Sequence, residues 1–181
     1  MRCAAAIAAA VIALGASGVG AYQLAPQPAP TSAHWRELAW PFPRDGWPAG
    51  RAFRCEGGPC DGAELYVRAK RGFCNCDSGV ADDEEVDRVA DIDLITPRFT
   101  AVSTGEVVHV GEMRGRARRY DLAMFDGASH AAVGVAVSRR CDLVVAAAQG
   151  RGEASTMQRA ALVFLETPEL KTWMIAALDG K

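Results

Sequence analysis

Apolar and polar positions alternate over several short stretches of the chain, and this pattern predicts β-strands. In the segment 64–70, Leu65, Val67 and Ala69 alternate with Glu64, Tyr66, Arg68 and Lys70, which is typical of a strand buried on one face only. Beyond residue 105, four more stretches alternate or are evenly apolar, and they comprise residues 106–113, 118–125, 131–137 and 142–149. Breaks of four or five residues separate them. Such short breaks permit hairpins only, so we expect an antiparallel meander.

Helical spacing of apolar residues follows the predicted strands. Near the C-terminus these residues recur at i, i+3, i+4, i+7 and i+8, and they are Leu170, Trp173, Met174, Ala177 and Leu178. Thr167 followed by Pro168 is a typical start for this helix. Ser155 and Gln158 form a capping-box pair, which predicts a second helix just before it.

Two shorter elements are expected between the first strand and the meander. Asp82 and Glu85 form another capping pair and predict a short helix. The segment 91–95 alternates again, so we expect it to enter a strand that Pro97 stops.

Together these elements predict an α+β fold. It consists of an antiparallel β-meander of four or more strands, with C-terminal amphipathic helices packed on one face and disulfides stabilising it. A meander that leads into a C-terminal amphipathic helix resembles the PsbP-like extracytoplasmic proteins over roughly residues 105–181. The resemblance is one of element order.

The N-terminal segment has the pattern of an export signal. Arg2 precedes an apolar run over 4–14, and small residues at 19–21 suit signal peptidase, so residues 1–21 are predicted to be a signal peptide. The alternative is an uncleaved anchor in the inner membrane, because residues 3–25 carry no charge. The sequence therefore predicts a periplasmic protein that contacts the membrane only if this segment is not cleaved.

Residues 22–50 are expected to form an extended arm that precedes a single α+β domain over 51–181. The arm is rich in proline, which excludes a long helix or a central strand, and it contains Trp35, Trp40 and Trp47. One interpretation is a strap that packs its rings into surface grooves. The other is an exposed aromatic patch for a partner protein.

Composition and motifs narrow the function classes. The net charge of −2 argues against a nucleic-acid partner. The chain has no Gly-x-Ser-x-Gly elbow, His-Glu-x-x-His motif or glycine-rich phosphate loop, and it contains only 3 histidines. The sequence therefore favours a non-enzymatic protein, although no motif decides the matter.

The cysteines carry most of the candidate chemistry. Of the 6 cysteines, Cys3 lies in the predicted signal, which leaves 6 − 1 = 5 in the mature chain. Cysteines usually pair in an oxidising compartment, so an odd number leaves at least one thiol free. The candidates for disulfides are Cys55, Cys60, Cys74, Cys76 and Cys141. The sequence leaves their pairing open.

Three interpretations compete for Cys74 and Cys76. Each of the two cysteines could form a structural bond to another cysteine. Alternatively, both thiolates could hold copper or zinc together with other donors, for which the candidates are His109, His130, Met113 and Met124. A third interpretation is thiol redox chemistry, because a Cys-x-Cys bridge is strained and nearby arginines favour a thiolate. No cofactor is expected beyond this possible copper or zinc.

Charged clusters offer one more candidate surface. The acidic run 82–87 does not match a calcium-binding loop, and acids favour the first turn of a helix. A basic cluster is expected at the end of a hairpin, where it is a solvated turn, a docking surface for an acidic partner, or a partner of the acidic helix. It comprises Arg114, Arg116, Arg118 and Arg119.

The segments WPFPRDGWPAGRAFRC, ELYVRAKRGFCNC and GVADDEEVDRVADIDL resemble those of uncharacterised exported proteins of alphaproteobacteria, over roughly residues 40–95. This resemblance implies a location and no defined chemistry. The sequence thus favours an exported, non-enzymatic binding or accessory module of an envelope complex, with the tryptophan arm and the arginines as its candidate surface. The alternative is a metal-binding or thiol-redox protein that uses Cys74 and Cys76.

Overall fold

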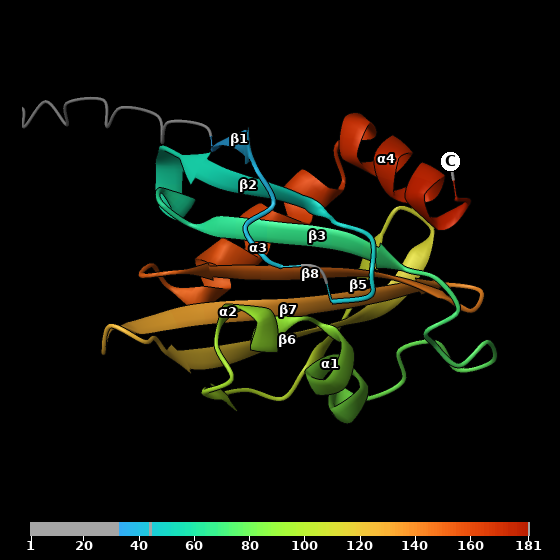
Figure 1. The fold of residues 1–181 in the computed structure, drawn as a ribbon, viewed down its shortest axis with the longest axis horizontal. Helices are drawn as coiled ribbons and strands as arrows, with labels where there is room; N and C mark the ends of the chain where they lie inside the picture. Colours follow the sequence, from blue (N-terminus) through green and yellow to red (C-terminus); the bar gives the residue numbers. More distant parts are fainter. Residues whose placement is uncertain (1–32, 44, 181) are drawn as a thin grey trace, which may run out of the picture.

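The computed structural model describes residues 33–43 and 45–180, and these residues build one antiparallel sheet with helices on both faces (Figure 1). The sheet has 8 strands in the order β1-β2-β3-β8-β7-β6-β4, and β5 also pairs with β6. The strands are β1 (His34–Leu38), β2 (Arg51–Glu56), β3 (Glu64–Lys70), β4 (Phe99–Ala101), β5 (Glu106–Val110), β6 (Met113–Ala123), β7 (Ser129–Arg139) and β8 (Asp142–Gly150). The helices are α1 (Asp83–Val89), α2 (Ile92–Ile95), α3 (Ala154–Leu165), α4 (Pro168–Leu178) and the 3₁₀ turn η1 (Gly58–Cys60).

The meander predicted from the sequence is present as β5 to β8, and the α+β fold class is confirmed. One boundary differs from the expectation. The segment 114–117, expected as a break, lies inside the 11-residue strand β6, and the turn before it is Gly111-Glu112. Gly111 adopts φ 57°, a conformation that glycine accepts without steric cost. The arginines of this segment therefore lie in a strand rather than at a hairpin end.

The two C-terminal helices cover one face of the sheet, as the sequence predicts. Leu170, Met174 and Leu178 of α4 are buried, together with Met157 and Leu165 of α3. They pack against inward-facing residues of the sheet in one continuous apolar core. Burial of each such side chain stabilises the fold by about 1.5–3 kcal/mol.

The opposite face of the sheet is covered as well, which the alternation in β3 did not predict. Helices α1 and α2 and the part of the arm that follows β1 lie over this face (Figure 1), where they enclose a second apolar core. Arg68 and Lys70, expected at a solvent-exposed face, are only 3% and 4% exposed. The expectation of a half-buried strand was wrong because a segment distant in sequence covers the polar side of β3.

The segment 91–95 is also different from its prediction. Its residues form the short helix α2 instead of entering a strand. Asp91 precedes the helix in the left-handed region, at φ 62°, and its carboxylate lies against Arg68 and Lys70 of β3. Ile92 is buried in the second core. These tertiary contacts override the local alternation of apolar residues.

The predicted helix starts are partly correct. The Asp82 carboxylate accepts a hydrogen bond of 2.9 Å from the backbone N–H of Glu85, as a capping residue does. Helix α4 begins at Pro168 after Thr167. Helix α3 begins two residues earlier than expected, after Glu153, whose carboxylate accepts a hydrogen bond from the Ser155 hydroxyl.

No helix in residues 33–43 and 45–180 is long and apolar enough to cross a membrane. The predicted signal peptide, residues 1–21, lies outside the described residues, as does the proline-rich part of the arm up to residue 32.

Candidate functional site

Two disulfides form among the five candidate cysteines. Cys55 bonds to Cys60 and Cys76 bonds to Cys141, while Cys74 remains a thiol. The fold is therefore stabilised by disulfides, as expected. The first bond closes a short local loop after β2, and the second joins the loop after β3 to the β7–β8 turn, 65 residues away in sequence.

The free thiol of Cys74 lies against the same turn. Its Sγ is 3.4 Å from the carbonyl oxygen of Arg140 and 3.7 Å from that of Asp142, the two neighbours of Cys141. Partial burial raises the pKa of Cys74, and the negative charges of Asp142 and Glu85 raise it further. The thiol form is favoured here, so Cys74 is a weaker nucleophile and metal ligand than an exposed cysteine.

The residues predicted to hold copper or zinc do not come together. Cys76 is used in a disulfide, His109 is exposed on β5, and the ring of His130 contacts Gln149 with its Nδ1 2.5 Å from the amide oxygen. Within the described ranges, no group of three or more His, Cys, Asp or Glu side chains is arranged to hold a metal ion. Cys141 takes the sulfur of Cys76, so Cys74 and Cys76 are not a pair of free thiolates in this fold.

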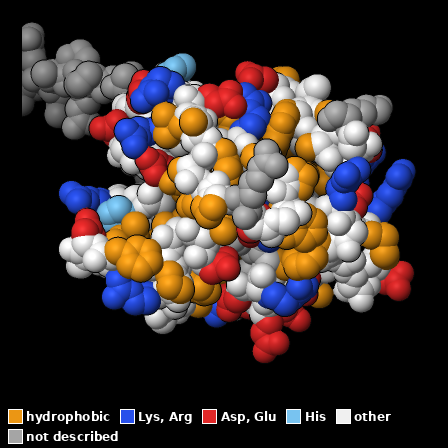
Figure 2. All heavy atoms as spheres, viewed as in Figure 1, with side chains coloured by type: hydrophobic (Ala, Val, Ile, Leu, Met, Phe, Trp, Pro, Cys, Tyr) orange, Lys and Arg blue, Asp and Glu red, His pale blue; other side chains and the backbone are white. Residues whose placement is uncertain are grey.

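The three tryptophans pack onto the domain on opposite faces of the sheet. Trp35 stacks on Phe164 of α3 with ring centroids 5.2 Å apart. Trp40 contacts Tyr66 edge-on, and Trp47 contacts Phe73 in the same way. This is the packing expected of a strap. The rings do not form one continuous patch, and Figure 2 shows the hydrophobic side chains of the visible face scattered among charged ones.

Buried ion pairs lie beneath the arm. The Asp91 carboxylate accepts hydrogen bonds of 2.5 Å from both Arg68 Nε and Lys70 Nζ, and Lys70 also donates to the carbonyl oxygen of Val89. Asp45 of the arm accepts a bond from Arg68, which lowers the pKa of the Asp45 carboxyl. Every buried side-chain nitrogen and oxygen of the described residues has a hydrogen-bond partner. This satisfied network is the packing of a structural element, and it leaves no polar group directed at a ligand.

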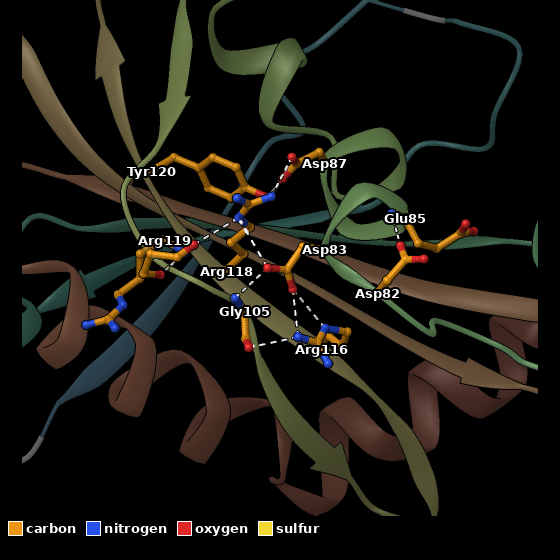
Figure 3. A network of polar contacts seen from close by, with 10 residues as sticks. Asp82, Asp83, Glu85, Asp87, Gly105, Arg116, Arg118, Arg119 and Tyr120 are labelled. Atoms are coloured by element: carbon orange, nitrogen blue, oxygen red, sulfur yellow. Dashed lines mark hydrogen bonds and ion pairs between the residues drawn. The ribbon is translucent and has the colours of Figure 1, made fainter.

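Two of the four arginines of β6 form ion pairs with the acidic helix α1 (Figure 3). Arg116 donates to the Asp83 carboxylate at 2.7 Å, and Arg118 donates to Asp87 at 2.6 Å. The Tyr120 hydroxyl also donates to Asp87. The sequence left three alternatives open for the basic cluster: a solvated turn, a docking surface, or pairing with the acidic helix. Arg116 and Arg118 pair with the acidic helix.

Arg114 and Arg119, the other two arginines of the cluster, do not form the expected docking surface. Arg114 is exposed, whereas Arg119 points to the other face of the sheet, because neighbouring residues of a strand alternate. Consequently the tryptophans and arginines proposed from sequence as one surface are distributed over both faces.

A cleft of about 600 Å³ lies at the end of the sheet that carries the Cys76–Cys141 bond. We call it the hairpin cleft; it is formed by the β5–β6 turn, the β7–β8 turn and α4. Its lining residues are Val110, Gly111, Glu112, Met113, Ser138, Arg139, Arg140, Lys171 and Ile175. A volume of this size suits a small ligand or a few residues of a peptide.

Cations surround an apolar part of the hairpin cleft. Val110 and Met113 are buried core residues that also line the cleft, and Ile175 is half-buried. Arg139 pairs with Asp179 at 2.9 Å and Lys171 with Glu166 at 3.1 Å. Arg140 is exposed and makes no ion pair with any residue that the structure describes.

The sequence contained a weak signal for this cleft. Two adjacent arginines, Arg139 and Arg140, at the end of one predicted strand, together with glycine in the opposite turn, indicate a basic turn end. The contribution of Lys171 and Ile175 could not be anticipated, because it depends on where α4 crosses the sheet.

Comparison with known proteins does not assign a function. No family model matches the chain, and no curated protein matches it. Among solved structures, the chain is similar to PA94 of Pseudomonas aeruginosa, described as a protein of unknown function and a candidate regulator. The sequence identity is 12%, the match covers 78% of this chain and 84% of that one, and the TM-score is 0.36. At this level of similarity nothing is transferred from it.

Proposed function

We propose that this protein is an exported, non-enzymatic binding module of the bacterial cell envelope, and that it binds an acidic segment of a partner protein in the hairpin cleft. The observation that carries the proposal is the combination of an unpaired Arg140, two further cations and an apolar floor in one concave site. Binding sites typically combine such an apolar lining with a few polar groups that fix orientation.

Export is supported by the disulfides and by the N-terminal sequence. Disulfides persist in oxidising compartments such as the periplasm and are rare in the cytosol. The bond Cys76–Cys141 connects segments far apart in sequence, and such a bond constrains the unfolded chain strongly. Together with the signal-like pattern of residues 1–21, this favours a periplasmic location.

An acidic ligand is supported by charge complementarity at the cleft. Arg139 and Lys171 already have the carboxylate partners Asp179 and Glu166, so the unpaired Arg140 is the cation that attracts a ligand carboxylate most strongly. Glu112, at the rim, disfavours a ligand that carries negative charge at every position. A segment that alternates acidic and apolar residues fits both the cations and the apolar floor. The metal-binding alternative is less well supported, because Cys76 is not available as a ligand.

Site-specific photocrosslinking in the native host tests the proposal. The crosslinker p-benzoylphenylalanine is placed at Glu112 or Ile175, which line the cleft without supplying its cations. Matched control positions are Val107 on β5 and Val163 on α3, which are 49% and 72% exposed. We expect the same discrete periplasmic adduct from both cleft positions, and its loss by at least about tenfold when Arg140→Glu is added.

Arg151→Glu is the matched control for that charge reversal, because Arg151 is an exposed arginine in the turn after β8, at the other end of the strand. It should leave the adduct unchanged. Equal adducts from the control positions, or none from the cleft positions, would show that the hairpin cleft is not the binding surface.

A further inference from the structure

Three cysteines converge at the β7–β8 turn, and one of them is a free thiol next to a disulfide. Cys76 bonds to Cys141, and Cys74 lies two residues before Cys76 in the same loop. The backbone N–H of Cys74 donates a hydrogen bond of 3.1 Å to the carbonyl oxygen of Cys141. The turn therefore has two cysteines of the loop beside it.

Both cysteines of the loop lie beside Cys141. The Cα atoms of Cys76 and Cys141 are 4.2 Å apart. The 3.1 Å hydrogen bond from the N–H of Cys74 to the carbonyl oxygen of Cys141 holds the backbones of these two residues in direct contact. Disulfides usually form between residues whose Cα atoms are about 4.4–6.8 Å apart, a separation that backbones in such contact can adopt. Pairing of Cys74 with Cys141 would therefore require rotation of side chains and only local adjustment of the loop.

We propose that Cys141 exchanges its disulfide partner between Cys76 and Cys74. The Cys74 thiolate attacks Sγ of Cys141, a Cys74–Cys141 bond forms, and the Cys76–Cys141 bond breaks. Cys76 leaves as a thiolate and takes up the proton that Cys74 lost. The numbers of thiols and disulfides stay the same, so the step needs no external oxidant or reductant.

This exchange changes the turn that supplies Arg140 to the hairpin cleft. Arg140 precedes Cys141 and adopts φ 59°, a left-handed conformation that is unfavourable for residues other than glycine. Its carbonyl oxygen accepts the contact from the Cys74 thiol, which disappears when that sulfur becomes part of a disulfide. In addition, Gly79 of the same loop lies directly against Ser138, another lining residue. The exchange thus regulates the ligand site. This regulation rests on the proposed function, whereas the exchange itself does not depend on it.

Disulfide mapping of a Cys76→Ser variant tests the alternative pairing. The variant is refolded in a glutathione redox buffer, alkylated and digested without reduction. We expect a Cys74–Cys141 bridge and no alkylated cysteine. The matched variant Cys74→Ser should keep the Cys76–Cys141 bridge. If Cys74 and Cys141 of the first variant are both alkylated while Cys55–Cys60 is intact and the circular dichroism is native, the alternative pairing is wrong.

The wild-type protein tests the exchange without relying on a variant. After incubation at pH 9 without glutathione, the thiols are trapped with N-ethylmaleimide in acid and mapped. We expect label at both Cys74 and Cys76, and a rate of exchange that falls about tenfold for each pH unit below the pKa of Cys74. Label at Cys74 alone at every pH, or a Cys74–Cys76 bridge, would overturn the proposal.

The link to the cleft has a separate readout. Photocrosslinking from Glu112 should differ at least about threefold between Cys76→Ser and Cys74→Ser, because the two variants hold the turn through different bridges. Equal yields would refute regulation while the mapped exchange stands. Loss of the adduct in wild-type protein as well would instead refute the hairpin cleft as the binding surface.

Discussion

At the residue scale, the main outcome is that Cys74 is the unpaired cysteine of the described chain. The sequence established that an odd number of cysteines leaves a thiol free. It could not select this thiol among the five candidates, because the pairing depends on the turn between β7 and β8 reaching the 74–76 loop. The sulfur of Cys76 is used in a disulfide, and the free Cys74 retains thiol chemistry.

The raised pKa of Cys74 predicts slow alkylation at neutral pH. Burial and the nearby carboxylates of Asp142 and Glu85 favour the thiol over the thiolate. Iodoacetamide should therefore react with native protein at pH 7 at least about tenfold more slowly than with unfolded protein, and faster as the pH rises. The rate is measured by mass spectrometry, with Cys74→Ser as the unlabelled control. Equal rates for folded and unfolded protein would contradict this account.

A buried carboxylate should be important for stability. In Asp91→Asn, Arg68 and Lys70 remain buried without their shared counter-ion, so we expect the free energy of unfolding to fall by about 3–5 kcal/mol. Asp93→Asn, at an exposed position of the same helix, should change it by less than about 0.5 kcal/mol. Urea unfolding measures both. A loss at Asp91 no larger than at Asp93 would mean that the network is not structurally important.

At the scale of elements, the meander and the terminal helices were predictable, whereas the layer over the opposite face was not. Alternation identifies a strand and its more apolar face, but it does not report whether another segment covers the polar face. Polar residues such as Arg68 can be buried when Asp45 and Asp91 arrive from distant parts of the chain. The contacts of Asp91 with β3 also explain why the segment 91–95 forms the helix α2, although its local pattern predicts a strand.

Helix α1 should depend on its ion pairs with β6 in a pH-dependent manner. The hydrogen bond from Gly105 N–H, followed by those from Arg116, lowers the pKa of Asp83 below its ordinary value of 3.8. This contribution is present above that value and is lost as the pH falls through the lower pKa of the folded state. At pH 7, Asp83→Asn should therefore reduce stability, by about 1 kcal/mol because the pair is partly exposed.

Acid titration of unfolding checks the sign of that effect. The difference in stability between wild type and Asp83→Asn should be constant above about pH 5 and decrease below about pH 4. Glu84→Gln, at an exposed position in the same turn, should show no such difference. A difference that grows on acidification would contradict the assigned ion pair.

At the scale of the whole molecule, the two disulfides should contribute unequally to stability. The Cys76–Cys141 bond spans 65 residues and the Cys55–Cys60 bond spans 5. Loop-closure entropy then gives about 4 kcal/mol for the first and about 2 kcal/mol for the second. Unfolding of Cys141→Ser and Cys60→Ser by urea measures the two losses. A larger loss for Cys60→Ser would show that local packing, rather than chain closure, dominates.

The tryptophans and arginines expected from the sequence to form one surface lie on both faces of the sheet. The hairpin cleft is therefore the candidate site. Tryptophans and arginines can be listed from a sequence, but the faces on which they lie depend on the register of β6 and on the path of the arm. The hairpin cleft arises only when two turns and α4 meet, so composition and spacing gave little indication of it.

The most direct test of the central claim is a nuclear magnetic resonance titration. Protein labelled with ¹⁵N is titrated with the peptide Asp-Leu-Glu-Leu-Asp and, as a control, with Lys-Leu-Lys-Leu-Lys. The account predicts that the acidic peptide alone shifts the amide signals of cleft residues such as Gly111, Glu112, Arg140 and Lys171, and that Arg140→Glu abolishes these shifts. Shifts confined to the arm or to the exposed face of α3, or equal shifts with the basic peptide, would contradict it.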